Sequence, residues 1–248
     1  MTEAARSECP IVELRRYRLW PGARETLISL FDRELVEPQE AVGMQVLGQF
    51  RDLDDDDCFI WLRGFRDMRT RRLGLESFYG GPVWQAHRDA ANATMISSDD
   101  VLLLRPARPG SGLKPAPDSR RPRGAGEAVT TLVVITCYFL RPGSSEAFAE
   151  GFEREATPLL RAAGATVRAL YRTEHSLNTY PALPVREDVE VFVSVAEFRD
   201  EVAYIRHLDE LERRHGRHDV LAPAVRERLQ GAPVISRLQP TARSLLGA

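Results

Sequence analysis

Short stretches rich in apolar residues recur along the chain, and each predicts a β-strand. In the first half they cover residues 11–19, 44–50, 58–67 and 101–106, and in the second half residues 132–140, 166–172, 190–200 and 234–240. After the first strand of each half, apolar residues recur at three- and four-residue spacing, which predicts an amphipathic helix. These helical positions are Leu27, Leu30, Phe31 and Leu35 in the first half, and Phe148, Phe152, Ala156 and Leu159 in the second.

The two halves show the same order of signals, which indicates an internal repeat. Both first strands close on a Pro-Gly pair, with Tyr17 matching Tyr138, and both third strands end in Phe-Arg-Asp. A second helical region and a final strand complete each copy, so each is β-α-β-β-α-β, the ferredoxin-like arrangement. We expect a tail at 1–10, a first domain at 11–106, a Pro/Gly-rich linker at 107–128 and a second domain at 129–248.

A ferredoxin-like sheet carries helices on one face and leaves the other face to be covered. Two copies in one chain can place their open faces together. The sequence therefore predicts an α+β fold in which two antiparallel sheets pack as an intrachain dimeric α/β-barrel, with a cavity between the sheets.

Strand alternation divides the side chains between the two faces of each sheet. We assign the aliphatic set, such as Val12 and Leu14, to the helix-covered face. The mixed aromatic and charged sets are assigned to the barrel interior: Glu13, Arg15, Tyr17, Phe59, Trp61 and Arg63 in the first half, and Val134, Thr136, Tyr138, Phe192, Ser194 and Ala196 in the second. A shift of one residue inverts this assignment. The alternative to a ligand cavity is an interior filled by its own side chains, with Glu13 paired to arginine.

Composition and charge narrow the possible partners. The chain has 248 residues, 43% of them hydrophobic, and a net charge of -2, which argues against a nucleic-acid surface. Among its basic residues Lys114 is the one lysine, so the positive charge is almost entirely guanidinium. Three widely spaced cysteines predict no disulfide framework and no cysteine metal site.

The sequence shows no signal peptide and no membrane-spanning run, so we expect a cytoplasmic protein. We expect it to be either a monomer with a pseudo-dimeric barrel or a homodimer.

Several segments of the first half resemble the NIPSNAP domain, a branch of the dimeric α/β-barrel superfamily. They are VELRRYRLWPG, GQF, FIWLRGFRDMRTR and FYGGPVWQAHRDAANATM, and the likeness covers about residues 11–106. The second half resembles a diverged copy without the Gly-Gly-Pro-x-Trp segment. Relatives in the superfamily include cofactor-free monooxygenases, polyketide cyclases, isomerases and haem enzymes, so the resemblance implies a fold more firmly than a reaction.

The segment from Gly80 to Asn92 carries the candidate acid or base. Pro82 suits the first turn of a helix on which Trp84, His87 and Ala91 share one stripe. Histidine titrates near neutrality, so His87 is a candidate general acid or base; the alternative is a histidine that only closes the helix over the sheet. The resemblance also leaves open a haem bound through His87 or His175. A metal held by His215, His218 and Asp219 is disfavoured, because Gly216 interrupts their helix and arginines surround them.

Together these observations predict a cofactor-independent enzyme of cyclase, isomerase or monooxygenase type, acting in secondary metabolism on a hydrophobic, aromatic or polyketide-like molecule held between the sheets. The candidate catalytic residues are His87, Arg63 and Arg15, and the candidate binding residues are Glu13, Tyr17, Trp61, Trp84, Tyr138 and Ser194. No metal and no cofactor are expected. The alternatives are a non-catalytic binding or scaffold protein and a haem-binding barrel.

Overall fold

A computed structural model describes residues 8–114, 119–126, 130–215 and 221–247. The first half contains β1 (Ile11–Leu19), β2 (Gln45–Asp52), β3 (Cys58–Phe65) and β4 (Met95–Pro106), with helices α1 (Arg24–Leu30), η2 (Phe31–Leu35), α2 (Val36–Ala41), α3 (Met68–Tyr79) and α4 (Pro82–Asn92). The second half contains β5 (Leu132–Leu140), β6 (Thr166–Thr173), β7 (Glu190–Phe198) and β8 (Val234–Pro240), with α5 (Ser145–Gly151), η4 (Phe152–Ala156), α6 (Thr157–Ala162), α7 (Glu201–His215) and α8 (Pro223–Arg226). Each half thus has the predicted β-α-β-β-α-β order.

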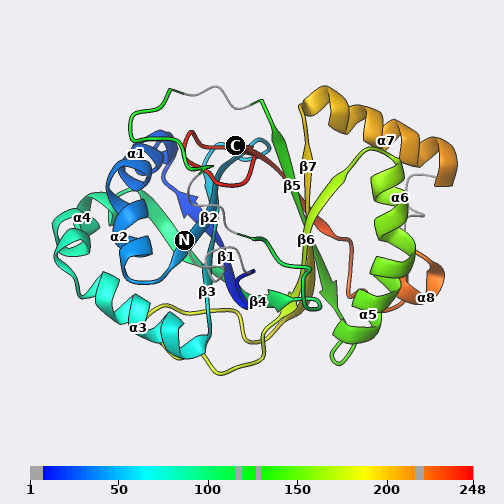
Figure 1. The fold of residues 1–248 in the computed structure, drawn as a ribbon, viewed down its shortest axis with the longest axis horizontal. Helices are drawn as coiled ribbons and strands as arrows, with labels where there is room; N and C mark the ends of the chain where they lie inside the picture. Colours follow the sequence, from blue (N-terminus) through cyan, green and yellow to red (C-terminus); the bar gives the residue numbers. More distant parts are fainter. Residues whose placement is uncertain (1–7, 115–118, 127–129, 216–220, 248) are drawn as a thin grey trace.

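The eight strands form one closed antiparallel barrel in the order β1-β3-β2-β8-β5-β7-β6-β4. The two sheets are joined edge to edge through β2 with β8 and β4 with β6, so neither sheet keeps a free edge there. The helices of the first half cover one outer side of the barrel and those of the second half cover the other (Figure 1). This confirms the predicted α+β fold with an intrachain dimeric α/β-barrel.

The Pro-Gly pairs mark the same turn in both halves. Gly22 has φ +77° and Gly143 has φ +75°, a backbone conformation that glycine adopts without steric cost. Each turn leads from the first strand into the first helix. The matched signal in the sequence therefore reflects a matched backbone.

Of the predicted linker, residues 115–118 and 127–128 lie outside the described residues, as do residues 1–7 of the predicted tail. The described linker residue Leu113 is buried, and its backbone N–H donates to the hydroxyl of Tyr171 at 2.8 Å. Leu113 and Leu246 both belong to the apolar cluster inside the barrel. Part of the linker thus contributes to the core, beyond connecting the halves.

The predicted assignment of strand faces is wrong in both halves. The barrel interior is the aliphatic cluster, with residues from both sheets: Val12, Leu14, Ile60, Leu62, Val133, Ile135, Val193 and Val195. The mixed sets, including Trp61 and Phe192, lie instead between each sheet and its own helices. An eight-stranded barrel is just wide enough inside for side chains to fill it or to hold one small ligand, so aliphatic residues suit the interior. The helix layer leaves room for aromatic and arginine side chains.

Candidate functional site

The charged residues of β1 and β3 form a buried cluster under the helices of the first half. Glu13, Arg15, Arg63 and Arg71 are all fully buried, and we refer to these four residues as the arginine cluster. Glu13 accepts three hydrogen bonds, from Arg15 Nη1 at 2.8 Å, from Arg63 Nε at 2.7 Å and from Arg71 Nε at 2.6 Å. Antiparallel pairing of β1 with β3 sets Glu13 opposite Arg63. Arg71 comes from the first turn of α3.

The arginine cluster holds more positive than negative charge. In the described part of the chain, Glu13 is the one carboxylate paired with the three guanidiniums. Burial alone would raise the pKa of Glu13, but the guanidiniums outweigh burial and hold its pKa well below the ordinary range. Burial lowers the pKa of Arg71, against the opposing effect of Glu13. Glu13 is therefore ionised, and two positive charges remain unbalanced.

Three buried donors in or beside the arginine cluster have no hydrogen-bond partner among the described residues. They are Arg63 Nη2, Arg71 Nη2 and the indole Nε1 of Trp61. Arg63 Nη1 makes only long contacts of 3.4 Å, to Gln39 Oε1 and to the Tyr79 hydroxyl. A buried donor without an acceptor carries a desolvation penalty, so this arrangement favours an acceptor supplied from outside the chain.

Aromatic rings surround the guanidiniums. Arg63 lies 5.1 Å from the ring centre of Trp61, and Arg15 lies 5.5 Å from that of Tyr17. Arg15 Nε donates to the Tyr17 hydroxyl oxygen at 3.1 Å, which leaves the hydroxyl proton free to be donated elsewhere. Burial raises the pKa of Tyr17 although Arg15 opposes the shift, so this tyrosine is neutral.

A small cavity of about 30 Å³ adjoins the cluster, between β1, β3 and the helices. Its wall includes Trp84 of α4 and four residues that contact Arg15 or Arg63, namely Tyr17, Trp61, Gln39 and Tyr79. This volume is close to that of one water molecule. A larger ligand therefore requires an outward movement of the covering helix.

The second half supplies part of the cover over the first. Arg71 Nη1 donates to Asn178 Oδ1 at 3.0 Å and to Thr179 Oγ1 at 3.3 Å. The ring of Tyr180 stacks on Tyr79 at 6.2 Å between centres. Asn178, Thr179 and Tyr180 belong to the connection between β6 and β7, which runs along α3 (Figure 1). We refer to residues 174–189 as the cover loop.

His87 lies at the edge of this region and not within the cluster. It shares a helix stripe with Trp84 and Ala91, which line the small cavity. Its Nε2 atom lies 3.9 Å from Glu34 Oε2 of η2, and its side chain is 31% exposed. His87 therefore stands between α4 and η2 on the outer side of the cavity. Its role as acid or base stays a prediction.

The structure separates the two predicted residues of the second half from the others. Tyr138 and Ser194 lie under the helices of their own half, where Tyr138 contacts Phe148, Phe152 and Phe192. The barrel wall stands between them and the arginine cluster. The remaining predicted binding residues, Glu13, Tyr17, Trp61 and Trp84, do come together with Arg15 and Arg63 in the first half.

Three residues of the site, Arg71, Gln39 and Tyr79, were not predicted from the sequence. Arg71 shares helical spacing with Leu75 and Phe78, both buried, so its place on the apolar stripe of α3 could have indicated a buried guanidinium. The fit of a haem is poor at this site. The cavity is far smaller than a porphyrin, His87 does not line it, and His175 is exposed in the cover loop.

The described residues contain no group of three or more His, Cys, Asp or Glu side chains arranged for a metal ion. His218 and Asp219 lie outside the described residues, as does the side chain of His215. Among the described helices, none has both the length and the apolar character needed to span a bilayer.

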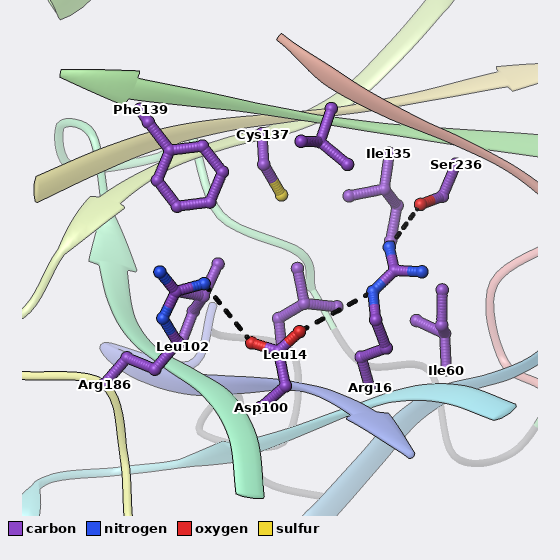
Figure 2. Close-up of a pocket in the computed structure, with 11 residues that line it drawn as sticks. Leu14, Arg16, Ile60, Asp100, Leu102, Ile135, Cys137, Phe139, Arg186 and Ser236 are labelled. Carbon is purple, nitrogen blue, oxygen red and sulfur yellow. Dashed lines mark hydrogen bonds and ion pairs between the residues drawn. The ribbon is translucent and has the colours of Figure 1, made fainter. Parts of the chain in front are cut away.

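A second cavity lies between the two sheets, at one end of the barrel (Figure 2). Its volume is about 140 Å³, and none of the predicted site residues lines it. A cavity thus exists where the sequence analysis expected one, but other residues form it.

Comparisons with known proteins support the fold. Residues 12–109 match the family model named NIPSNAP. Among solved structures, a candidate monooxygenase of Fusobacterium nucleatum is 11% identical, with a TM-score of 0.55 over 94% of this chain and 93% of that chain. A candidate monooxygenase of Lactobacillus acidophilus is 11% identical, with a TM-score of 0.53 over 94% of both chains. An anthrone oxidase-like protein is 13% identical, with a TM-score of 0.54 over 96% of this chain and 93% of that chain.

At these identities the likeness shows a shared fold alone. The search of curated proteins returned no significant match.

Proposed function

We propose that the domain matching the NIPSNAP family model, residues 12–109, binds a mostly apolar molecule with an acidic or enolisable oxygen and stabilises that oxygen as an anion. The observation that carries the proposal is the arginine cluster, with its unbalanced positive charge and buried donors without acceptors. The binding site is then between the first sheet and its helices, and not between the two sheets.

Preorganised donors in a site shielded from water are an effective way to stabilise a developing oxyanion. Arg63 Nη2 and Trp61 Nε1 are buried donors that can donate to such an oxygen, since neither has an acceptor among the described residues. Glu13 fixes the orientation of Arg63 without neutralising the whole cluster. In this proposal the cluster lowers the cost of forming an enolate or phenolate, which is the step shared by cyclase, isomerase and cofactor-free oxygenase chemistry.

Proton transfer in the proposed site has two candidates. Tyr17 is neutral and has a free hydroxyl proton, so it suits a donor to the substrate oxygen. His87 stands where a molecule entering between α4 and η2 would pass, so it suits a base at the entrance.

The non-catalytic alternative rests on the size of the cavity. At about 30 Å³ the space beside the cluster is nearly filled, as it would be if the cluster only organised the helix layer. A binding or scaffold role then needs no turnover.

Anthrone is a suitable first probe, since it is an aromatic ketone that enolises and one similar structure is of an anthrone oxidase-like protein. We expect anthrone-dependent oxygen consumption by the purified protein. Arg63→Met and His87→Ala should lower it, while Arg72→Met, which removes an exposed arginine on α3, should not. If Arg63→Met and His87→Ala both left turnover unchanged, the site assignment would be wrong.

A thermal-shift panel of enolisable ketones and aromatic carboxylates extends the test beyond anthrone. A ligand at one hundred times its dissociation constant stabilises a protein by about 2.7 kcal/mol. A shift that Arg63→Met abolishes supports the proposed site. No shift across the panel, together with no turnover, supports the scaffold role.

A further inference from the structure

The cavity between the sheets has an apolar wall formed by both halves of the chain. Its lining residues are Leu14, Arg16, Ile60, Asp100 and Leu102 from the first half, and Ile135, Cys137, Phe139, Arg186, Val234 and Ser236 from the second. Figure 2 shows Cys137 and Phe139 facing the arginine and aspartate side chains across the cavity. The cavity is separate from the arginine cluster, because it lies on the other face of β1 and β3.

The size of this cavity corresponds to a single ring. Its volume is about 140 Å³, and a protein cavity of about 150 Å³ lined by aliphatic and aromatic residues is known to hold benzene. Leu14, Ile60 and Ile135 give it an aliphatic wall, all three nearly inaccessible to solvent. Burial raises the pKa of the Cys137 thiol to about 12, so this side chain is uncharged as well.

The polar groups of the cavity gather around Asp100. Asp100 lies between Arg16 and Arg186 (Figure 2), at 3.9 Å from Arg16 Nε and 3.5 Å from Arg186 Nη1. Both distances are longer than a good charge-assisted hydrogen bond, so Asp100 keeps acceptor capacity. Arg16 also pairs with the buried Asp52 at 3.2 Å. Two arginines and two aspartates thus balance, which favours an uncharged ligand over an anion.

We infer that this cavity is a second ligand site, for an uncharged monocyclic aromatic molecule with a hydroxyl group, such as a simple phenol. The ring lies against the aliphatic wall and Phe139. The hydroxyl group donates to Asp100 and accepts from Arg186. This inference does not depend on the function proposed for the arginine cluster, since the two sites share no residue.

Ligand-observed NMR titrations with phenol, benzene and benzoate test the assignment in the full-length protein. We expect phenol to bind about tenfold more tightly than benzene, since it adds a hydrogen bond to a charged group. Benzoate should bind more weakly than phenol, because its carboxylate would lie beside Asp100. Asp100→Ala should weaken phenol binding about tenfold and strengthen benzoate binding. The matched control Asp99→Ala removes an exposed aspartate from the same strand and should change neither.

Two further variants test whether phenol binds inside this cavity, because each of them reduces its volume. Cys137→Met fills the interior, and Val234→Trp narrows the cavity from a position that is 45% exposed, where folding is less at risk. Either should abolish phenol binding, with a thermal melt to confirm that the variant is folded. Phenol binding that survives in a folded variant of each kind would overturn the inference, as would benzoate binding more tightly than phenol in the unmodified protein.

Discussion

The helix-covered layers of the two halves occupy equivalent positions in one repeat, yet they hold opposite chemistry. In the first half, Glu13 pairs across β1 and β3 with Arg63, and Arg15 pairs with Trp61. The equivalent pairs of the second half are Val134 with Ala196 and Thr136 with Ser194, in the same register. Arg71, in the first turn of α3, corresponds to Tyr204 at the same place in α7.

The second half fills the equivalent space with apolar side chains and ring packing instead. Val134, Phe198 and Tyr204 are buried in one cluster, and the rings of Phe198 and Tyr204 lie 5.1 Å apart between centres. None of these three side chains is charged, so the space needs neither a counterion nor a ligand. The fold itself therefore does not need the arginine cluster, because the same β-α-β-β-α-β unit closes without it in the second half.

The largest expected loss of stability comes from removing Glu13, the single carboxylate of the arginine cluster. Glu13→Gln leaves three buried guanidiniums without a counterion, so it should lower the free energy of unfolding by about 3–5 kcal/mol. Urea denaturation measures this, with Glu76→Gln, an exposed glutamate on α3, as the control expected to change little. A loss below about 1 kcal/mol, the range of a surface pair, would contradict the description of the cluster.

The same carboxylate predicts a pH dependence. The folded pKa of Glu13 is lowered, so its contribution is fully present above the unfolded pKa of about 4.3 and is lost as pH falls toward the folded value. The difference in unfolding free energy between the unmodified protein and Glu13→Gln should be constant from pH 7 to about 5 and shrink below about 4.3. Urea titrations at several pH values measure it. If the difference in unfolding free energy between the two proteins grew as the pH fell, the predicted lowering of the Glu13 pKa would be contradicted.

Removing the hydrogen-bond acceptors of Arg71 should lower the free energy of unfolding by less than Glu13→Gln does. The double variant Asn178→Ala, Thr179→Val deprives a buried guanidinium of two acceptors, which should destabilise by about 1–3 kcal/mol. Faster hydrogen exchange in α3 should accompany the loss. Ser176→Ala, whose hydroxyl pairs only with Glu174 of the same loop among the described residues, is the matched control. Equal effects of the two variants would show that the cover loop does not hold Arg71.

The smallest change in stability is expected for Arg63→Met. This variant removes one of the unbalanced positive charges and leaves Glu13 with two partners, so the free energy of unfolding should change by less than about 1 kcal/mol. Ligand binding at the cluster should nevertheless fall. A large destabilisation by Arg63→Met, comparable to that of Glu13→Gln, would indicate that the cluster serves stability, as the ring packing of the second half does.

The sequence alone established the repeat and the order of elements. Pro-Gly pairs, helical spacing and Phe-Arg-Asp recur because each copy must make the same turns and bury the same helix face. The match of Glu13, Arg15, Trp61 and Arg63 to one face of the sheet also follows from alternation, since it requires only that β1 and β3 are strands.

Only the tertiary structure decided which face is inside. Alternation looks the same when both faces are exchanged, and the choice depends on the width of a closed eight-stranded barrel, which no local pattern encodes. The contact of Arg71 with Asn178 likewise joins residues 107 positions apart, from two different copies of the repeat. Such pairings arise only when the two sheets close on each other, because closure is what brings the cover loop over α3.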